Sequence, residues 1–409
     1  MKAAPRLNKE HLGVGCFIPT KKAEKYVLQV LRSGRLSYGP FIKRFERKFA
    51  KEHNTRFAVM VNSGTSALRI AFACLKETEK WSDGDEILVP ATTFIATANT
   101  VTSNGLKVVF VDVDPKTYNI DPEDMRRKIS TRTRGVVPVH LMGLPADMKP
   151  IQEMARKHKL KIVEDSCETM FAKYRETSVG SLGDIACFST YIAHMIVTGV
   201  GGLALTNNPK YAKILRSLAN HGRDNIYISI DDGKGKKGKA FEEIIARRFR
   251  FVRAGFSFRV TEFEGALGCA ELEGGRAIVK ARQKNAAYLI KQLKPLEQFL
   301  QLPTYPSYSD HAFMLFPLVL RKGPRVKKRD LVNFLESRSI ETRDLMPLIN
   351  QPYIRKNFSI RTGDFPVADW LNTHGFYIGC HQVMRQVELD YIVKVFFDFY
   401  KSHGFKTKN

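Results

Sequence analysis

Apolar and polar positions along the first half of the chain switch repeatedly between the periodicity of strands and that of helices. Short apolar runs alternate with segments in which apolar residues recur at helical spacing. Strands are predicted at 57–62, 86–89, 107–111, 133–139, 161–164 and 184–189, and helices at 21–33, 41–53, 63–75, 96–103 and 151–158. This order predicts βαβ units, and therefore a mainly parallel sheet that is covered by helices on both faces.

Polar motifs follow several of the predicted strands, at the sheet edge where α/β proteins usually bind ligands. The motif NSGTSAL (62–68) opens a predicted helix, so Gly64 and Thr65 offer backbone N–H groups and a hydroxyl to a phosphate. Ordinary helix capping is the alternative interpretation of this motif. Asp165 and Ser189 end two further strands. An acid in the first of these places either caps a loop or pairs with a ring nitrogen of a cofactor.

The second half of the chain has a different pattern. Residues 222–250 are rich in glycine and lysine, and we expect them to form a loop or flap. A helix over 261–273 follows, and then a strand at 312–319 and helices at 328–336 and 387–400 predict a smaller α+β unit. We therefore expect a large domain over 1–270 and a small C-terminal domain over 271–409.

Composition is that of a soluble, folded protein. The 409 residues are 44% hydrophobic and 26% charged, and no apolar run is long enough to span a membrane. The N-terminus lacks the apolar core of a secretory signal. The six cysteines lie far apart without zinc-like spacing, so we expect reduced thiols, no metal and a cytoplasmic location.

The net charge of +25 leaves three interpretations open: a nucleic-acid binder, a binder of small anions, or a basic solvated surface. The basic residues are spread over the chain, with short clusters at 234–239, 247–250 and 325–329. None of these clusters matches a known nucleic-acid-binding motif. We therefore expect neither nucleic acid nor a membrane as a partner.

Ordered sequence blocks over most of the chain give a sharper expectation. They include LSYGPFIKRFERKFAKEHN (36–54), VNSGTSALRIA (61–71), VPATTFIATANTV (89–101), EDSCETMFAKY (164–174), GFSFRVTEFEGALGCAELE (255–273) and LNTHGFYIGCHQ (371–382). In these blocks the chain resembles the DegT-type sugar aminotransferases. These are pyridoxal-phosphate enzymes of fold type I that act on nucleotide-linked keto sugars, and they work as homodimers.

The resemblance implies roles for several residues at the sheet edge. Gly64, Thr65 and Ser189 would hold the cofactor phosphate, Phe94 would lie against the pyridine ring, and Asp165 would keep the ring nitrogen protonated. Because family sites are built from both subunits, Ser257, Arg259 and parts of 220–250 would reach the partner's cofactor. His140, Arg223 and Arg259 are candidate substrate contacts. For His140 and Phe94, packing in the core is the alternative.

One departure from the family pattern changes the expected chemistry. His194 occupies the position of the lysine that binds the cofactor covalently, and no lysine occurs between Lys173 and Lys210. Imidazole cannot make that link, but it can act as a general base. The chain thus resembles the family's nucleotide-sugar 3-dehydratases, such as those acting on GDP-4-keto-6-deoxymannose, which have this histidine. They bind pyridoxamine phosphate noncovalently.

Other departures keep alternatives open. Glu168, three residues after Asp165, supports the dehydratase branch, and 222–250 contains no cysteine for the iron–sulfur cluster of related dehydratases. Val200 and Ser257, however, replace a glutamate and an asparagine of the family pattern. Three interpretations follow: a 3-dehydratase with His194 as base, an aminotransferase with an unusual site that uses glutamate as amino donor, or a noncatalytic binder of cofactor or sugar.

Overall fold

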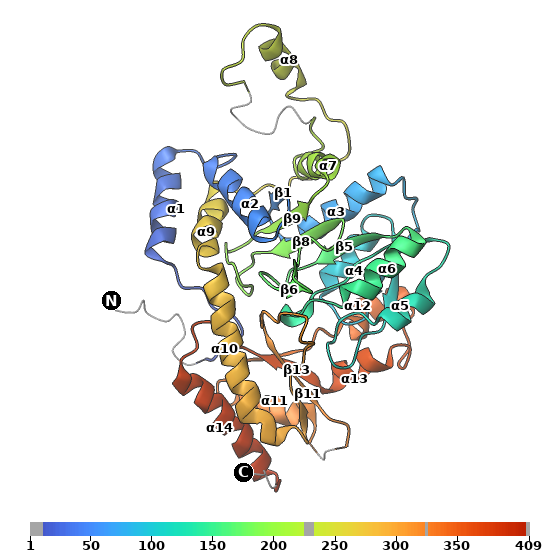
Figure 1. The fold of residues 1–409 in the computed structure, drawn as a ribbon, viewed down its shortest axis with the longest axis vertical. Coiled ribbons are helices and arrows are strands. Elements are labelled where there is room, and N and C mark those ends of the chain that lie inside the picture. Colours follow the sequence, from blue (N-terminus) through green and yellow to red (C-terminus); the bar gives the residue numbers. More distant parts are fainter. Residues whose placement is uncertain (1–10, 225–232, 324–325, 406–409) are drawn as a thin grey trace.

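The computed structural model describes residues 11–224, 233–323 and 326–405. Its centre is a seven-stranded sheet in the order β1-β9-β8-β5-β4-β2-β3 (Figure 1). The strands are β1 (Phe57–Val61), β2 (Glu86–Pro90), β3 (Lys107–Val111), β4 (Thr133–Val136), β5 (Lys161–Asp165), β8 (Ile185–Ser189) and β9 (Gly202–Thr206). The β2, β3, β4, β5 and β8 pairings are parallel, and this confirms the predicted mainly parallel sheet.

β9 is a strand that the sequence analysis did not predict. It runs antiparallel to both β1 and β8, between which it lies. The sequence of β9 is GLALT, and the three residues before it, GVG, have no regular hydrophobic pattern. So short an apolar run is easily taken for part of a loop. Because β9 closes the gap beside β1, it brings the end of β8 next to the start of the helix that follows β1.

The predicted helices of the first half are present with small shifts at their ends. They are α1 (Lys21–Ser33), α2 (Pro40–Glu52), α3 (Gly64–Thr78), α4 (Ile95–Thr102) and α6 (Met148–His158), and the helix predicted over 261–273 is α9 (Glu262–Leu272). Two further helices are α5 (Pro122–Lys128) and α7 (Pro209–Ala219). In Figure 1, α1, α2 and α9 lie together at the left, and α4, α5 and α6 lie at the right. The helices α5 and α7 were not predicted. A two-stranded hairpin, β6 (Lys173–Tyr174) with β7 (Thr177–Ser178), precedes β8.

The close contact between α2 and α9 depends on small residues and one acid. A Cβ at Gly268 would lie 2.7 Å from the Phe45 ring, and one at Gly265 would lie 2.6 Å from the Ile42 nitrogen. At the start of α9, Glu262 accepts hydrogen bonds from the backbone N–H groups of Gly39, Phe41 and Ile42. These bonds satisfy donors that the first turn of α2 leaves free.

A second, four-stranded antiparallel sheet lies below the first in Figure 1. It consists of β10 (Leu300–Gln301), β11 (Phe316–Leu320), β13 (Gly375–Ile378) and β12 (Thr342–Asp344), in that order. The helices around it are α10 (Gly275–Leu293), α11 (Lys328–Glu336), α12 (Pro352–Phe358), α13 (Pro366–His374) and α14 (Gln386–Ser402). This is the smaller α+β unit that the sequence predicts.

The helix α10, which the sequence analysis did not identify, contributes to two separate clusters of buried apolar residues. Val279 belongs to the larger cluster, whereas Leu289 and Leu293 belong to the smaller one around the second sheet. Leu12 pairs with Ile340, so the first described residues also lie beside the small sheet. The domain limits 1–270 and 271–409 stay a prediction.

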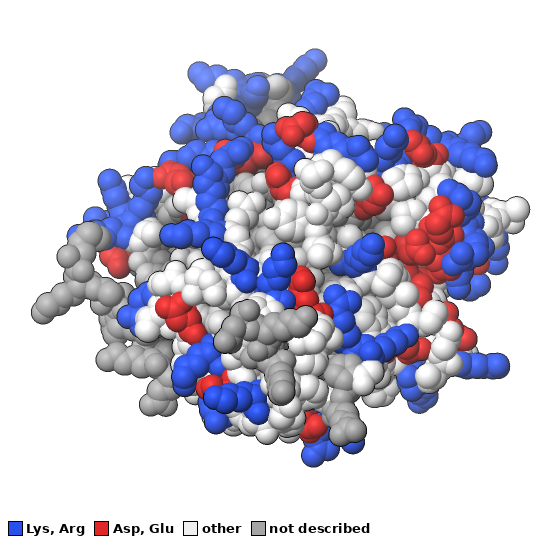
Figure 2. All heavy atoms as spheres, turned by 60° about the horizontal axis from the view of Figure 1, so that its bottom comes forward, with Lys and Arg blue, Asp and Glu red and all other residues white. Residues whose placement is uncertain are grey.

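The stretch predicted as a loop or flap contains a helix. Within 222–250, α8 (Lys239–Arg247) stands away from the rest of the chain at the top of Figure 1, and 225–232 lie outside the described residues. Basic side chains cover much of the face in Figure 2, with acidic ones among them, which fits the spread-out excess of +25. Among the described residues, no helix has the length and apolar character needed to cross a membrane.

Candidate functional site

The beginning of α3 meets the end of β8 in a contact that requires glycine. A Cβ on Gly64 would lie 2.7 Å from Cys167 Sγ and 2.9 Å from the Ser189 Cβ. Ser63 caps the helix by accepting a hydrogen bond from the Ser66 nitrogen. The N–H groups of Gly64 and Thr65 are therefore in the first helical turn, where they have no partner within the helix. This is the arrangement that binds phosphate.

The loop between β8 and β9 places His194 beside this helix start. The loop is closed by a 2.6 Å hydrogen bond between the hydroxyls of Thr190 and Thr198, and Gly201 pairs with Ser63. Within it, His194 Nδ1 lies 3.1 Å from Ser189 Oγ. Two of the residues expected at the cofactor are thus in direct contact, and the other ring nitrogen of His194 is left for a reactant.

Burial lowers the pKa of His194 to about 4. The positive charge of Arg282 acts in the same direction, while contact with the Tyr191 backbone opposes it. A histidine with such a pKa is neutral at neutral pH, so it can accept a proton.

Asp165 is held at the end of β5 by two hydrogen bonds. Thr97 Oγ1 donates to Asp165 Oδ2 at 2.8 Å, and the Cys167 nitrogen donates to Oδ1 at 3.2 Å. Burial raises the pKa of Asp165, and its hydrogen bonds with Cys167 and Thr97 oppose that rise. A buried carboxylate of this kind is stabilised by a positively charged ring N–H. Asp165 is therefore suited to the role that the family resemblance implies.

Phe94 is the N-cap of α4 and follows Thr93, whose hydroxyl contacts that of Thr97 in the first turn of the helix. Its side chain is 60% exposed, which excludes the alternative of core packing within one subunit. A large aromatic ring at a ligand-binding edge of a sheet offers an apolar face to a planar ligand. Thr65 is likewise exposed.

His140 has no exposed surface and both of its ring nitrogens are bonded. Nδ1 accepts from the Ala146 nitrogen, and Nε2 lies 3.0 Å from Glu164 Oε2. The same carboxylate also accepts from the backbone nitrogens of Gly180, Leu182 and Gly183. This geometry favours the core-packing interpretation of His140 over a substrate contact.

Glu168 is buried close to Asp165 and accepts a 2.7 Å hydrogen bond from the Met142 nitrogen. Burial raises the pKa of Glu168 to about 7, and the nearby charge of Asp165 adds to this rise. The carboxyl is therefore partly protonated near neutral pH and can donate as well as accept a hydrogen bond.

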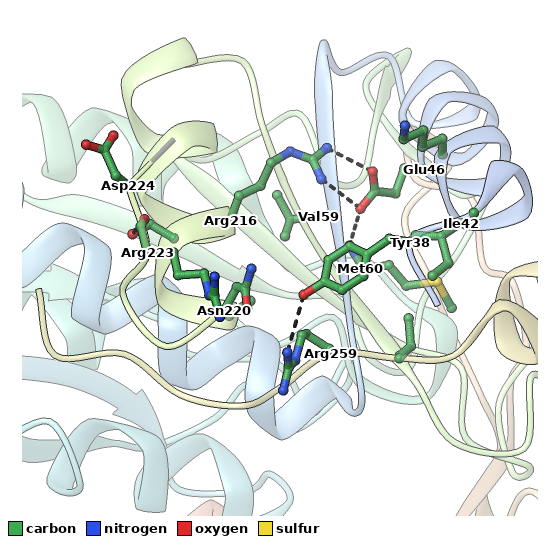
Figure 3. A pocket seen from close by; sticks show the side chains of 15 residues that line it. Tyr38, Ile42, Glu46, Val59, Met60, Arg216, Asn220, Arg223, Asp224 and Arg259 are labelled. Carbon is green, nitrogen blue, oxygen red and sulfur yellow. Dashed lines mark hydrogen bonds and ion pairs between the residues drawn. The ribbon is translucent and has the colours of Figure 1, made fainter. Parts of the chain in front are cut away.

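A second group of predicted residues lies at a cavity that His194 does not line. Arg259 donates to Ser257 Oγ at 2.8 Å, contacts His221 Nε2 at 3.0 Å and donates to the Tyr38 hydroxyl at 3.4 Å. Arg259 and Tyr38 line a cavity of about 340 Å³, together with Arg216, Asn220 and Arg223 (Figure 3). Neither Ser189 nor His194 lines this cavity.

Arg223 contacts two aromatic rings, whereas Val200 is exposed. Arg223 donates to the Arg248 carbonyl, and its guanidinium lies 4.9 Å from the centre of the Phe249 ring and 5.5 Å from that of Phe251. It therefore packs against the segment that follows α8. Val200 is an exposed apolar residue on the loop that carries His194.

Three residues close to the candidate site were not identified from the sequence. Thr97 and Cys167 hold Asp165, and both lie within sequence blocks that suggested the family, so their hydroxyl and thiol were available signals. Arg282 is fully buried and acts on His194 from α10. It lies within an ordinary basic helix sequence, ARQK, which carries no signal of this position.

Comparison with known proteins identifies the family of the chain. Residues 19–397 match the DegT/DnrJ/EryC1/StrS aminotransferase family. GDP-perosamine synthase of Caulobacter vibrioides is 31% identical over 370 residues, which cover 90% of this chain and 92% of that protein. GDP-4-keto-6-deoxy-D-mannose 3-dehydratase of Escherichia coli O55:H7 is 30% identical over 380 residues, with 91% and 95% covered.

A solved structure of E. coli GDP-4-keto-6-deoxy-D-mannose-3-dehydratase with bound hydrated PLP superimposes with a TM-score of 0.85. It is 27% identical and covers 95% of this chain and 100% of that one. A histidine-to-asparagine mutant of GDP-4-keto-6-deoxymannose-3-dehydratase with bound GDP-perosamine also has a TM-score of 0.85 and 27% identity, with 94% and 99% covered. The chain belongs to the DegT/DnrJ/EryC1/StrS aminotransferase family.

Proposed function

We propose that this protein is a pyridoxamine-phosphate-dependent enzyme that removes the 3-hydroxyl of a nucleotide-linked 4-keto-deoxy sugar. The observation that carries the proposal is the position of His194. It replaces the cofactor-binding lysine, it contacts Ser189 at the end of β8, and it is neutral at neutral pH. A base that cannot hold the cofactor covalently favours proton removal from a noncovalently bound cofactor.

The residues around α3 fit pyridoxal or pyridoxamine 5′-phosphate. The helix start at Gly64 and Thr65, together with the Ser189 hydroxyl, would bind the phosphate, and the lack of a side chain at Gly64 lets this helix start pack closely against Cys167 and Ser189. Phe94 would cover the ring, and Asp165 would pair with the ring nitrogen. When bound, the protonated ring supplies an electron sink for charge at the neighbouring 4′-carbon.

The chain's own residues would then act on protons. His194 Nε2 would act as the base toward the proton on the 4′-carbon, while Ser189 Oγ holds its Nδ1. Asp165 keeps the ring nitrogen protonated from its buried position. Glu168, with a pKa of about 7, is able to donate a hydrogen bond near the ring.

The substrate and partners are proposed by analogy with the relatives. Their names specify GDP-linked keto-deoxy sugars and, in one solved structure, a PLP–glutamate adduct. We therefore assign a nucleotide-linked sugar as substrate and glutamate as the amino donor that regenerates the cofactor. We further propose a cytoplasmic homodimer in which Ser257 and Arg259 complete the partner's site; Arg259, which holds Ser257, lines a cavity that His194 does not line.

An aminotransferase is the second candidate, because GDP-perosamine synthase is as similar in sequence as the dehydratases are. A noncatalytic binder is the third, because Val200 and Ser257 depart from the family pattern. The third candidate leaves unexplained why a neutral histidine is held against Ser189 at the end of β8.

The role of His194 is tested with the variant His194→Asn. Asparagine has nearly the same width but no basic nitrogen, so we expect exchange of the cofactor's 4′-proton with solvent to fall by at least about 100-fold. The dissociation constant of pyridoxamine phosphate should stay nearly the same. Persisting exchange in the variant would show that another group is the base.

The candidate reactions are distinguished by their products. With a 4-keto sugar nucleotide and glutamate, a dehydratase releases ammonia and forms a 3-deoxy sugar, whereas an aminotransferase forms a stable amino sugar. Borohydride treatment with pyridoxal phosphate should trap no protein link if His194 replaces the lysine. A trapped lysine would support the aminotransferase. If the protein binds neither cofactor form at micromolar concentration, it is a noncatalytic protein.

A further inference from the structure

A short segment near the start of the described chain contacts both apolar cores. Residues 12–16, here called the bridging segment, begin beside the small sheet. The Leu12 nitrogen donates to the Ser339 carbonyl at 2.8 Å, and the Glu341 nitrogen donates to the Leu12 carbonyl at 3.1 Å. Leu12 packs against the smaller cluster of buried apolar residues, whereas Val14 packs against the larger one. The bridging segment therefore passes from the small sheet to the part of the chain around the central sheet.

One carboxylate fixes the middle of the bridging segment. The Val14 nitrogen donates to Glu341 Oε2 at 2.8 Å, and a Cβ on Gly13 would lie 3.1 Å from the same oxygen. Glu341 precedes β12, and Gly379 follows the neighbouring strand β13. A Cβ on Gly379 would lie 2.2 Å from the Gly13 carbonyl oxygen, so the two backbones pack directly against each other. The bridging segment is thus held at one end of the small sheet.

On its other side, the bridging segment meets the loop that carries His194. A Cβ on Gly15 would lie 3.2 Å from the Ala193 Cα and 3.5 Å from the Ile192 carbonyl oxygen. The first distance is shorter than an ordinary contact between carbon atoms, so this approach depends on the lack of a side chain at Gly15. The segment therefore packs against the loop backbone one residue before His194.

The two halves of that loop are held in different ways. The second half is anchored in the core, because Met195 and Ile196 belong to the larger apolar cluster. The first half carries His194, whose backbone nitrogen donates within the loop to the Tyr191 carbonyl at 2.9 Å. The contact at Gly15 therefore supports the half of the loop on which the position of the imidazole depends.

We propose that the bridging segment positions His194 for proton removal, with Gly15 and Glu341 as positioning residues. Glu341 holds the segment on the small sheet, and the backbone at Gly15 holds the loop. An error of about 1 Å in the position of a catalytic group can lower a rate by roughly 100-fold, so such a contact can govern the rate without touching the cofactor. This inference rests on the proposed function, because it concerns the base of that reaction.

The test combines two measurements on the full-length protein. Amide hydrogen exchange, followed by mass spectrometry, reports how firmly the loop 190–201 is held, whatever the protein catalyses. Exchange of the 4′-proton of pyridoxamine phosphate with solvent reports whether the base is in place. The dissociation constant of the cofactor should stay nearly the same in every variant, because none of the changed residues belongs to the proposed cofactor site.

Two variants should disturb the loop. Gly15→Val places a branched side chain against Ala193, and we expect 4′-proton exchange to fall by about 30-fold. Glu341→Ala removes the acceptor of the Val14 N–H, and we expect amide exchange in the loop to rise, and 4′-proton exchange to fall, by about tenfold each. Amide exchange in the central sheet should not change, which distinguishes a local effect from general unfolding.

Two further variants are matched controls. Glu341→Gln keeps an oxygen that can accept from the Val14 N–H, so it should retain most of the wild-type rate. Arg343→Met removes the other partner of Glu341 and leaves the acceptor of Val14 in place, so it should behave as the wild type does.

Faster amide exchange in the loop together with slower 4′-proton exchange, in Gly15→Val and Glu341→Ala but not in the controls, would support the proposal. An unchanged loop, or a faster loop with unchanged 4′-proton exchange, would overturn it. Equal losses in Arg343→Met would also overturn it, because any change near Glu341 would then have the same effect. A wild type that exchanges no 4′-proton would instead overturn the proposed function, and this inference with it.

Discussion

Single side chains decide the geometry of the candidate site, and Gly64 is the clearest case. It begins α3 at a point where Cys167 Sγ and the Ser189 Cβ leave no room for a further carbon. The same contact sets the distance between the helix start and the Ser189 hydroxyl, both of which would bind the cofactor phosphate. Glycine is therefore required by close approach.

We expect Gly64→Ala to weaken pyridoxamine-phosphate binding by roughly 10- to 100-fold, because overpacking of this size costs about 1–3 kcal/mol. Fluorescence titration with the cofactor measures the dissociation constant. Gly274→Ala is the control, since a Cβ there lies 3.6 Å from its nearest neighbour in ordinary helical backbone. Adding Cys167→Ala to Gly64→Ala should restore part of the affinity. If Gly64→Ala binds normally, the phosphate lies elsewhere.

At the scale of elements, the end of α2 is joined to the central sheet by a buried histidine. The ring of His53 lies 4.5 Å from that of Phe188 in β8 and 4.6 Å from that of Phe49 in α2. His53 Nδ1 donates to the Val179 carbonyl at 2.9 Å, whereas Nε2 has no partner among the described residues. Burial lowers the pKa of His53 to about 4.

This burial predicts a pH dependence with a definite sign. In the unfolded chain His53 has a pKa near 6.5, so it binds a proton more readily there than in the folded protein. Its contribution to the free energy of unfolding is therefore fully present above pH 6.5 and is lost as the pH falls to about 4. The loss amounts to about 3 kcal/mol. Glu168 acts oppositely, because burial raises its pKa to about 7.

Comparison of the wild type with His53→Phe separates the contribution of His53 to the pH dependence of stability from that of opposing groups such as Glu168. We expect the free energy of unfolding, measured with urea between pH 7 and pH 4, to fall less steeply in the variant. The same substitution at exposed His158 in α6 should leave the slope unchanged. An unchanged slope in His53→Phe would mean that His53 is protonated in the folded protein.

At the scale of the whole molecule, the predicted site residues form two groups. One contains Gly64, Asp165, Ser189 and His194, and the other contains Ser257 and Arg259 beside the cavity of Figure 3. Twofold association of two copies, as in the proposed homodimer, would bring the second group of one copy to the first group of the other.

The dimer is tested by mixing two inactive variants, His194→Asn and Arg259→Met. Each mixed dimer would contain one site with both wild-type residues, so random mixing should restore about one quarter of the wild-type activity. Light scattering gives the oligomeric state of each variant. No recovery from mixed dimers would mean that each site is complete within one chain.

The excess of basic residues is also a property of the whole molecule. A site for a phosphate and a nucleoside diphosphate needs few positive side chains, while the +25 is spread over the surface seen in Figure 2.

The sequence by itself determined the fold class, most of the strands and helices, the family, and the replacement of lysine by His194. These features are local: they depend on hydrophobic periodicity and on residue type at fixed spacing, both of which are read along the chain. The antiparallel β9 and the helix α10 were missed because their short or mixed patterns carry no distinct period.

Only the tertiary structure decided what each side chain touches. It gave His140 a bonded place in the core, left Phe94 exposed, brought Arg282 from α10 into electrostatic contact with His194, and left α8 uncovered. Burial and contacts between distant segments arise from packing of the whole chain, and the pKa values of His194 and Glu168 follow from that burial. The residue types therefore define which chemistry is possible, and the packing defines which groups can perform it.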